Sequence, residues 1–207
     1  MTIFIIVGMP ASGMNVARQY AESRGFPYFA TGDLVRREVS RMGLEPNAPN
    51  MARVSTELRG KDGLGVTRLV LATALDARSP VVFLEGMRSW PEIELIREDA
   101  EAVVVAFLAP REVRLRRTLS RGRSDDSPDH FQERDLREIQ YGTAAPIALA
   151  DEYILNTAGI DEARTALEEI VKRWTAYDKE IGSVSCEERS DKEIPPTLSL
   201  PLTGHKR

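Results

Sequence analysis

Cysteine and histidine are scarce in this 207-residue sequence, which contains one cysteine, Cys186, and two histidines. A single cysteine cannot form an internal disulfide, and one cysteine with two histidines cannot complete a four-ligand zinc site. We therefore expect neither an internal disulfide nor a structural metal ion.

Long hydrophobic runs are also missing. The longest apolar stretches, residues 2–7 and 102–109, are far too short to span a bilayer. The first residues carry neither the basic flank nor the cleavage site of a secretory signal. The net charge of −4 argues against a broad nucleic-acid-binding face. We expect a cytoplasmic protein without a membrane or nucleic-acid partner, and the pattern favours no particular oligomeric state.

Lysine is the third shortage, because five of the 28 basic residues are lysines and none precedes Lys61. The planar guanidinium of arginine can hold phosphate or carboxylate through two hydrogen bonds, and it stays charged. Two interpretations remain open. The arginines serve anion binding, or a GC-rich coding bias produced the excess.

The composition, 42% hydrophobic and 29% charged, is that of one well-buried globular domain. Short apolar runs bounded by glycine and proline alternate with segments of helical spacing. This alternation predicts a parallel sheet covered by helices on both faces, an α/β fold with three layers. We expect strands at residues 2–7, 27–30, 80–84, 102–108 and 153–155.

Helices are expected between these strands, with a turn at residues 45–50, EPNAPN. After residue 181 the sequence turns to Ser, Glu, Lys and Pro without periodicity. It therefore predicts a domain at 1–180 and a flexible tail at 181–207. The expected helices cover residues 13–24, 31–42, 51–58, 65–77, 110–120 and 161–177.

Residues 8–15, GMPASGMN, follow the first expected strand. Their length and glycines match the phosphate-binding loop G-x-x-x-x-G-K-[ST], but Met14 replaces the lysine and Asn15 the hydroxyl residue. A glycine-rich turn from a strand into a helix presents backbone N–H groups to an anion. A tight turn whose glycines serve backbone geometry alone is the alternative, and the stretch by itself favours neither.

The missing lysine affects catalysis more than binding. The backbone of such a loop can hold phosphate unaided, whereas one lost transition-state donor costs roughly 3–4 kcal/mol, or about 10²–10³ in rate. The side-chain oxygen of Asn15 could still meet Mg²⁺. Arg18, one helical turn later, either supplies positive charge or is a surface residue.

Five further motifs follow in a set order: TGDLVRRE at 31–38, LRGKDGLGVTR at 58–68, LEGMRSWPEIE at 84–94, RGRSDDSPDHFQERDLREI at 121–139 and ADEYILN at 150–156. Together with the loop they resemble the archaeal adenylate-kinase-related family, often labelled dephospho-CoA kinase-like, within the P-loop nucleoside-monophosphate-kinase group. The resemblance spans about residues 1–176. It implies a five-stranded parallel sheet, a small helical acceptor-binding region at about 33–77 and an arginine-rich lid at about 117–137.

The resemblance also assigns binding residues. It implies that ATP phosphates bind the loop formed by Gly8, Met9, Pro10, Ala11, Ser12, Gly13, Met14 and Asn15. It places the acceptor against Asp33, Arg36, Arg59 and Arg88. Arg37, adjacent to Arg36, cannot share its helix face, and a surface salt bridge is the alternative for it. For Arg59 the alternative is an exposed helix-end arginine that complements the helix dipole.

Glu85 follows the third strand, where the family usually carries an aspartate that holds Mg²⁺ through water. The resemblance therefore implies a Mg²⁺ site at Asn15 and Glu85. The extra methylene of glutamate displaces the metal or its water where geometry sets the rate. A strand-end carboxylate paired with a neighbouring arginine is the alternative.

In phosphoryl transfer, arginines of a closing lid meet the charge of the migrating group. The resemblance assigns this catalytic role to Arg121, Arg123, Arg134 and Arg137, and Arg117 stays undecided. Arg134 and Arg137, three apart, share a helix face. The alternative is local neutralisation of these arginines by Asp125, Asp126, Asp129, Glu133 and Asp135. Asn156 and Thr157 match the place where such folds seat adenine.

Two functions follow from these residues. The first is phosphoryl transfer from ATP, with Mg²⁺, to a small nucleotide or a coenzyme A precursor, weakened by Met14. The second is a nucleotide-binding sensor or partner-binding module without useful turnover, which the changes at Met14, Asn15 and Glu85 favour. An inert relative that binds nothing ranks last, because most candidate arginines are present.

Overall fold

The computed structural model of the protein describes residues 1–122 and 126–181. Arg123, Asp125, Cys186 and residues 182–207, for which the sequence makes predictions, lie outside this part of the chain. Within the described ranges, no helix is both long enough and apolar enough to cross a membrane.

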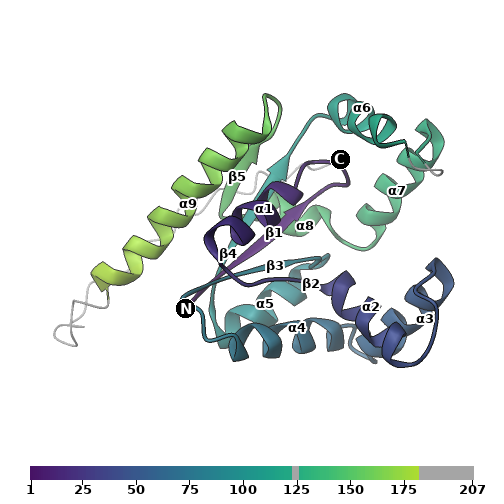
Figure 1. Ribbon diagram of the computed structural model, residues 1–207, viewed down its shortest axis with the longest axis horizontal. Helices are drawn as coiled ribbons and strands as arrows, with labels where there is room; N and C mark the ends of the chain where they lie inside the picture. Colours follow the sequence, from purple (N-terminus) through teal and green to yellow (C-terminus); the bar gives the residue numbers. More distant parts are fainter. Residues whose placement is uncertain (123–125, 182–207) are drawn as a thin grey trace, which may run out of the picture.

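A parallel sheet forms the centre of the molecule (Figure 1). The strand order is β2-β3-β1-β4-β5, and every neighbouring pair is parallel. Among the described residues this confirms the predicted five-stranded parallel sheet. The strands are β1 (Thr2–Gly8), β2 (Tyr28–Ala30), β3 (Val81–Glu85), β4 (Glu101–Leu108) and β5 (Glu152–Leu155).

Helices cover both faces of the sheet, because alternate residues of a strand point to opposite sides. Phe4 and Ile6 of β1 belong to a core formed with α1 (Asn15–Arg24) and α9 (Ile160–Ile181). Ile3 and Ile5 belong to a second core, formed with α4 (Gly65–Asp76) and α5 (Trp90–Asp99). The short helix α8 (Ala144–Ala148) lies against this second core. These layers confirm the three-layer α/β/α prediction.

Two further groups of helices flank the carboxyl ends of the central strands (Figure 1). On one side, α2 (Thr31–Arg41) and α3 (Ala48–Arg59) form a small core with the start of α4. On the other side lie α6 (Arg111–Arg121) and α7 (Pro128–Gln140). The helical acceptor-binding region and the lid remain predictions for these two groups.

The expected turn at residues 45–50 is wrong in its second half, because α3 begins at Ala48. The side-chain oxygen of Asn47 accepts a hydrogen bond from the N–H of Asn50 at 3.1 Å and caps the helix. Pro49 fits the first turn, where no N–H donor is needed. Turn-forming residues therefore start a helix here.

Three helices, α5, α7 and α8, have no counterpart among the expected ranges. The start of α5 carries a signal in the sequence, since Ser89 stands three residues before Glu92. The N–H and the hydroxyl of Ser89 both donate to Glu92 Oε2, at 2.9 and 3.0 Å. By contrast, α8 has five residues, too few for a periodic pattern.

Candidate functional site

The loop of residues 8–15 turns between the end of β1 and the start of α1, and its glycines are required by close approach. Gly13 has a φ of 100°, and a Cβ there would lie 1.9 Å from Asn156 Nδ2. A Cβ at Gly8 would lie 2.5 Å from Ser12 Oγ. Ala11 also has positive φ, 63°. The backbone path is therefore specific to this glycine pattern.

Side chains from two other elements hold the loop by its carbonyl oxygens. Arg114 Nη1 donates to Pro10 O at 3.1 Å, and Arg117 Nη1 donates to Ser12 O at 3.3 Å. Asn156 Nδ2 also donates to Ser12 O, at 2.9 Å. The carbonyls thus point toward α6 and β5.

The N–H groups at the end of the loop, unlike its carbonyl groups, are not hydrogen-bonded within the described part of the chain. Those of Gly13, Met14 and Asn15 have no hydrogen-bond partner among the described residues. They precede or begin α1, where the helix dipole favours an anion. This combination of free N–H donors and a helix N-terminus suits a phosphate group.

Arg114 was missed in the sequence although it supports the loop most directly. It pairs with Asp135 of α7 through two bonds, Nη1–Oδ1 at 2.6 Å and Nη2–Oδ2 at 2.7 Å. Both residues are buried. Its spacing of three from Arg117 indicates a shared helix face, a signal that could have identified it.

Asn156 and Arg117 lie together at the end of β5. Arg117 Nη2 donates to the backbone oxygen of Asn156 at 2.9 Å and to its Oδ1 at 3.2 Å. The Asn156 side chain is 4% exposed and bonded to the loop. Thr157 is exposed and lines none of the cavities described below.

A cavity of about 570 Å³, here called the α6 cavity, lies on one side of the loop. The structure brings the predicted residues Asn15, Glu85 and Arg121 to this cavity together with the loop. The beginning of α9 closes another side. Its lining consists of Ala11, Gly13, Met14, Asn15, Val16, Glu85, Arg117, Ser120, Arg121, Asn156, Gly159 and Ile160.

A second cavity of about 420 Å³, here called the α3 groove, lies between α2, α3 and α7. Arg59, Arg88 and Arg137 line it, together with Tyr141. The guanidinium carbons of Arg59 and Arg88 lie 6.0 and 5.1 Å from the centre of the Tyr141 ring. Aromatic contact of this kind holds arginines in place.

Asp33 and Arg36 do not line the α3 groove. Arg36 Nη1 lies 2.8 Å from Asp33 Oδ1, and Arg18 Nη2 lies 2.9 Å from Asp33 Oδ2. Asp33 is thus shared by two arginines. Burial lowers the pKa of Arg18, and the hydrogen bond and charge of Asp33 outweigh this effect, so the pKa is raised.

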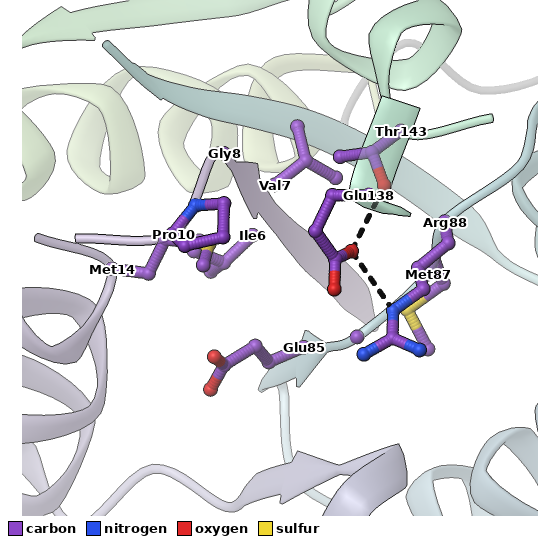
Figure 2. A pocket seen from close by; sticks show the side chains of 11 residues that line it. Ile6, Val7, Gly8, Pro10, Met14, Glu85, Met87, Arg88, Glu138 and Thr143 are labelled. Carbon is purple, nitrogen blue, oxygen red and sulfur yellow. Dashed lines mark hydrogen bonds and ion pairs between the residues drawn. The ribbon is translucent and has the colours of Figure 1, made fainter. Parts of the chain in front are cut away.

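A small central cavity of about 130 Å³ separates the other two (Figure 2). Gly8, Pro10 and Met14 line it from the loop. It shares Met14 and Glu85 with the α6 cavity, and Gly86, Arg88 and Glu138 with the α3 groove. The three cavities therefore adjoin one another across the loop.

Glu85 lies at the end of β3 beside the partly buried phenol of Tyr28. Tyr28 Oη donates to Glu85 Oε2 at 2.6 Å, and Arg18 Nη2 lies 3.9 Å from the same oxygen. Burial raises the pKa of Tyr28 far above its usual range, and the charge of Glu85 raises it further. Tyr28 therefore stays a neutral donor to Glu85.

The donors available for Mg²⁺ are few. The described residues contain no cluster of three or more His, Cys, Asp or Glu that could hold a metal. Mg²⁺ is usually bound by one or two carboxylates together with substrate phosphates and water. Glu85 and Asn15 line the same cavity and fit such a partial set, in which the nucleotide supplies the remaining oxygens.

The predicted lid arginines go to different places. Arg121 and Arg134 both bind Asp126 Oδ1, at 3.1 and 3.0 Å, and this carboxylate is 1% exposed. Arg137 lines the α3 groove instead. Arg121 thus lines the α6 cavity while it is paired with Asp126. Arg123 lies outside the described residues.

Glu138 has no role in the sequence-based prediction. It projects from α7 into the central cavity, where Arg88 Nε lies 3.1 Å from its Oε2 and Thr143 Oγ1 donates to the same oxygen at 3.3 Å (Figure 2). Its spacing of four from Arg134 places both on one side of the helix. That spacing is the signal available in the sequence.

Comparison with known proteins gives two results at the level of sequence. A family model described as an AAA domain matches residues 7–132. A UPF0200 protein of Methanosarcina mazei is 34% identical over 185 residues, covering 87% of this chain and 99% of that protein. A UPF0200 protein of Thermococcus gammatolerans is 34% identical over 182 residues, covering 82% and 96%.

Solved structures share the fold. TT1252 from Thermus thermophilus has a TM-score of 0.60 and 20% identity, and the match covers 83% of this chain and 97% of that one. Shikimate kinase from Acinetobacter baumannii, solved in complex with shikimate, has a TM-score of 0.52 and 17% identity, covering 85% and 93%. This chain thus shares its fold with TT1252 and with shikimate kinase.

Proposed function

The chain belongs to the UPF0200 family, whose members matched here are archaeal, and from the geometry of its loop we propose that it binds ATP through residues 8–15. In this proposal it transfers the γ-phosphoryl group to a small nucleotide or a coenzyme A precursor. One observation carries it. Gly13, Met14 and Asn15, whose N–H groups are free of partners among the described residues, line the α6 cavity, and Met14 also lines the central cavity that joins it to the α3 groove, an arrangement that suits two substrates.

The α6 cavity receives the nucleotide. The loop N–H groups hold its phosphates, with Arg117 and Arg121 providing positive charge. Asn15 and Glu85 would hold Mg²⁺, which when bound offsets the charge between the β- and γ-phosphates. The adenine lies toward Asn156 and Thr157 and is held by backbone groups, because the Asn156 side chain is bonded to the loop.

The α3 groove receives the acceptor. Arg59, Arg88 and Arg137 converge on it, while Arg36 and Asp33 form the ion pair beside it. Arginine suits this role because its fork matches the oxygens of phosphate and carboxylate. Arg121, Arg123 and Arg134 act in the lid, and Arg137 reaches from the lid side to the acceptor.

Met14 weakens the chemical step in this proposal. The position lines both the α6 cavity and the central cavity, where a lysine would contact the transferring group. The thioether supplies no positive charge. Loss of one transition-state donor lowers the rate by about 10²–10³, so slow turnover is expected.

A second candidate is a nucleotide-binding sensor or partner-binding module without useful turnover. The combination of Met14, Asn15 and Glu85 favours it, because three positions that handle γ-phosphate and Mg²⁺ differ together. Both candidates require nucleotide binding, and they differ in whether ATP is consumed.

Calorimetry with ATP and with AMP tests the common requirement. We expect binding in the micromolar to millimolar range. Gly13→Ala should weaken ATP binding at least tenfold, because its Cβ overlaps Asn156. Gly25→Ala is the matched control, since Gly25 also has positive φ and no atom lies within 4 Å of a Cβ there. No heat and no thermal shift with either nucleotide would overturn both candidates.

A further inference from the structure

Glu138 offers one unused oxygen to the central cavity. Its Oε2 takes both contacts, from Arg88 Nε and from Thr143 Oγ1. Its Oε1 accepts no hydrogen bond from the described residues, and Figure 2 shows this oxygen turned into the cavity. The ion pair with Arg88 and the hydrogen bond from Thr143, both at the other oxygen, restrain the direction in which Oε1 points.

This oxygen lies between the phosphate loop and the acceptor groove. Glu138 lines the central cavity together with Gly8, Pro10 and Met14, and it also lines the α3 groove. Its side chain is 20% exposed. A ligand in the groove that extends toward the loop must therefore pass Glu138.

Charge is distributed unequally along this path. In the groove, Arg59 and Arg137 have no ion-pair partner among the described residues. Arg88 is compensated by Glu138. At the loop end the free oxygen of Glu138 faces the same central cavity as Glu85. Glu92 also lines the groove, so its three arginines and two carboxylates leave one net positive charge, whereas the Glu138 side of the central cavity is negative.

A hydroxyl group fits the loop end better than a phosphate does. A carboxylate accepts hydrogen bonds only, so it binds a hydroxyl directly and repels a phosphate oxygen. Glu85 is less suited to this task, because it does not line the α3 groove and Figure 2 shows its carboxylate directed away from Glu138. The two carboxylates therefore serve different sides of the loop.

We propose, on the premise of the function above, that the acceptor is a small hydroxylated anion and that Glu138 is a catalytic residue toward its hydroxyl. The anionic group binds Arg59 and Arg137, and the hydroxyl donates to Glu138 Oε1. Arg88 and Thr143 are positioning residues that act through Glu138.

The transfer step balances with these groups. The hydroxyl oxygen forms a bond to the γ-phosphorus of ATP, and the bond from that phosphorus to the β–γ bridging oxygen breaks. Its electron pair leaves with ADP. The hydroxyl proton goes to Glu138 Oε1 and then to solvent. The product is a phosphate ester, whereas a phosphate acceptor would give an anhydride and would need no base.

Water is the simplest hydroxyl acceptor and serves as the first probe. We expect Glu138→Gln to lower the kcat of MgATP hydrolysis about 10²-fold, the lower end of general-base effects, with the KM for ATP unchanged. Glutamine keeps an oxygen for Arg88 and Thr143, so the melting temperature should be retained. The same comparison in a Met14→Lys background provides a faster reaction.

Glu133→Gln is the matched control, because it removes the same charge from an exposed position of α7. Its kcat should equal that of the wild type. Equal rates for the Glu138 and Glu133 variants would overturn the role of Glu138. Absence of ATP binding and of any hydrolysis, even with Met14→Lys, would instead overturn the proposed function.

The class of acceptor is tested by the bond formed. Glycerate, gluconate and ribose 5-phosphate offer a hydroxyl with an anionic group, whereas AMP and CMP offer a phosphate. Phosphorus NMR of the products distinguishes a new ester from a new anhydride. We expect an ester, with Arg137→Gln raising the acceptor KM at least fivefold. An anhydride as the main product would overturn the proposal. If water is the only acceptor that reacts, the rates of ATP hydrolysis of the Glu138→Gln and Glu133→Gln variants decide whether Glu138 has this role.

Discussion

Arg114 of α6 and Asp135 of α7 form a two-bond ion pair beneath the phosphate loop, with N–O distances of 2.6 and 2.7 Å. The arginine is 6% exposed, and its Nη1 also donates to Pro10 O at 3.1 Å. The ring of Phe131 lies 5.1 Å from its guanidinium carbon. One buried cation thus links two helices and the loop.

Removal of either partner should destabilise the fold strongly. Arg114→Ala leaves Asp135 as an uncompensated buried charge, and Asp135→Ala does the same to Arg114. We expect each to lower the free energy of unfolding by about 3–5 kcal/mol. Urea unfolding followed by circular dichroism measures this change.

The matched control is Arg116→Ala on the same helix. Arg116 pairs with Glu112 at 3.6 Å, and both side chains are exposed. Exposed pairs of this kind contribute less than about 1 kcal/mol. A cost for Arg114→Ala as small as that of the control would show that the pair does not hold α6, α7 and the loop together.

Met14→Lys should raise Mg²⁺-dependent ATP consumption by about 10² or more, because it restores a transition-state donor. The position lines both cavities that border the loop. Phosphate release under saturating ATP measures the change. Met42→Lys is the control, since Met42 is exposed at the end of α2 and lines neither of those two cavities, and its rate should stay at the wild-type level.

The expectation would be contradicted if the wild type already consumes ATP and Met14→Lys leaves the rate unchanged. In that case another cation has taken over the role of the lysine. Arg18 is the nearest alternative on α1, one turn beyond the loop, although Asp33 already binds it.

The strands could be predicted because each is apolar along most of its length. Residues 2–7 and 102–108 lie in the middle of the sheet, so both of their faces are covered and no polar residue interrupts them. The loop after β1 also follows from the sequence, since the glycines and the apolar run before it are adjacent. These features depend on neighbouring residues alone.

The side-chain contacts of the site could not be predicted in the same way. Arg134 and Arg137 share a helix face by spacing, yet Arg134 binds Asp126 and Arg137 lines the α3 groove. The cavity that an arginine enters depends on how α7 packs against α6 beyond the carboxyl ends of the strands. Asn156 shows the same limit, because its contact with Ser12 O joins segments 144 residues apart.

Asn156→Ala should loosen the phosphate loop. The substitution removes the 2.9 Å hydrogen bond to Ser12 O, which keeps the 3.3 Å bond from Arg117, and it removes one acceptor of Arg117. We expect the free energy of unfolding to fall by about 0.5–1.5 kcal/mol, the usual net contribution of a hydrogen bond. Urea unfolding measures it, with the exposed Thr157→Ala as control.

Tripolyphosphate, which lacks the adenine ring, distinguishes two roles of the Asn156 side chain: support of the loop and contact with adenine. If the side chain acts through the loop, Asn156→Ala should weaken the binding of tripolyphosphate as much as the binding of ATP. If the side chain contacts adenine, the substitution should weaken the binding of ATP alone. Calorimetry with the two ligands therefore decides between these roles.

Tyr28 should make stability depend on pH in the alkaline range. Its pKa is raised in the folded protein by burial and by Glu85, whereas the unfolded value is about 10. Because the folded state holds the proton more tightly, this stabilisation is complete below pH 10. It is lost as the pH rises from 10 toward the raised pKa, at about 1.4 kcal/mol per pH unit.

Tyr28→Phe tests this relationship by removing the hydroxyl. At pH 8 the variant should be about 1.5–3 kcal/mol less stable than the wild type, because Glu85 loses a hydrogen bond to a charged acceptor. Between pH 10 and pH 11 this difference should shrink, since the wild type alone loses the contribution of Tyr28. Urea unfolding at the three pH values measures it. Tyr153→Phe, which removes a hydroxyl bonded to Ala148 O, is the control, and a constant difference for Tyr28→Phe would contradict the raised pKa.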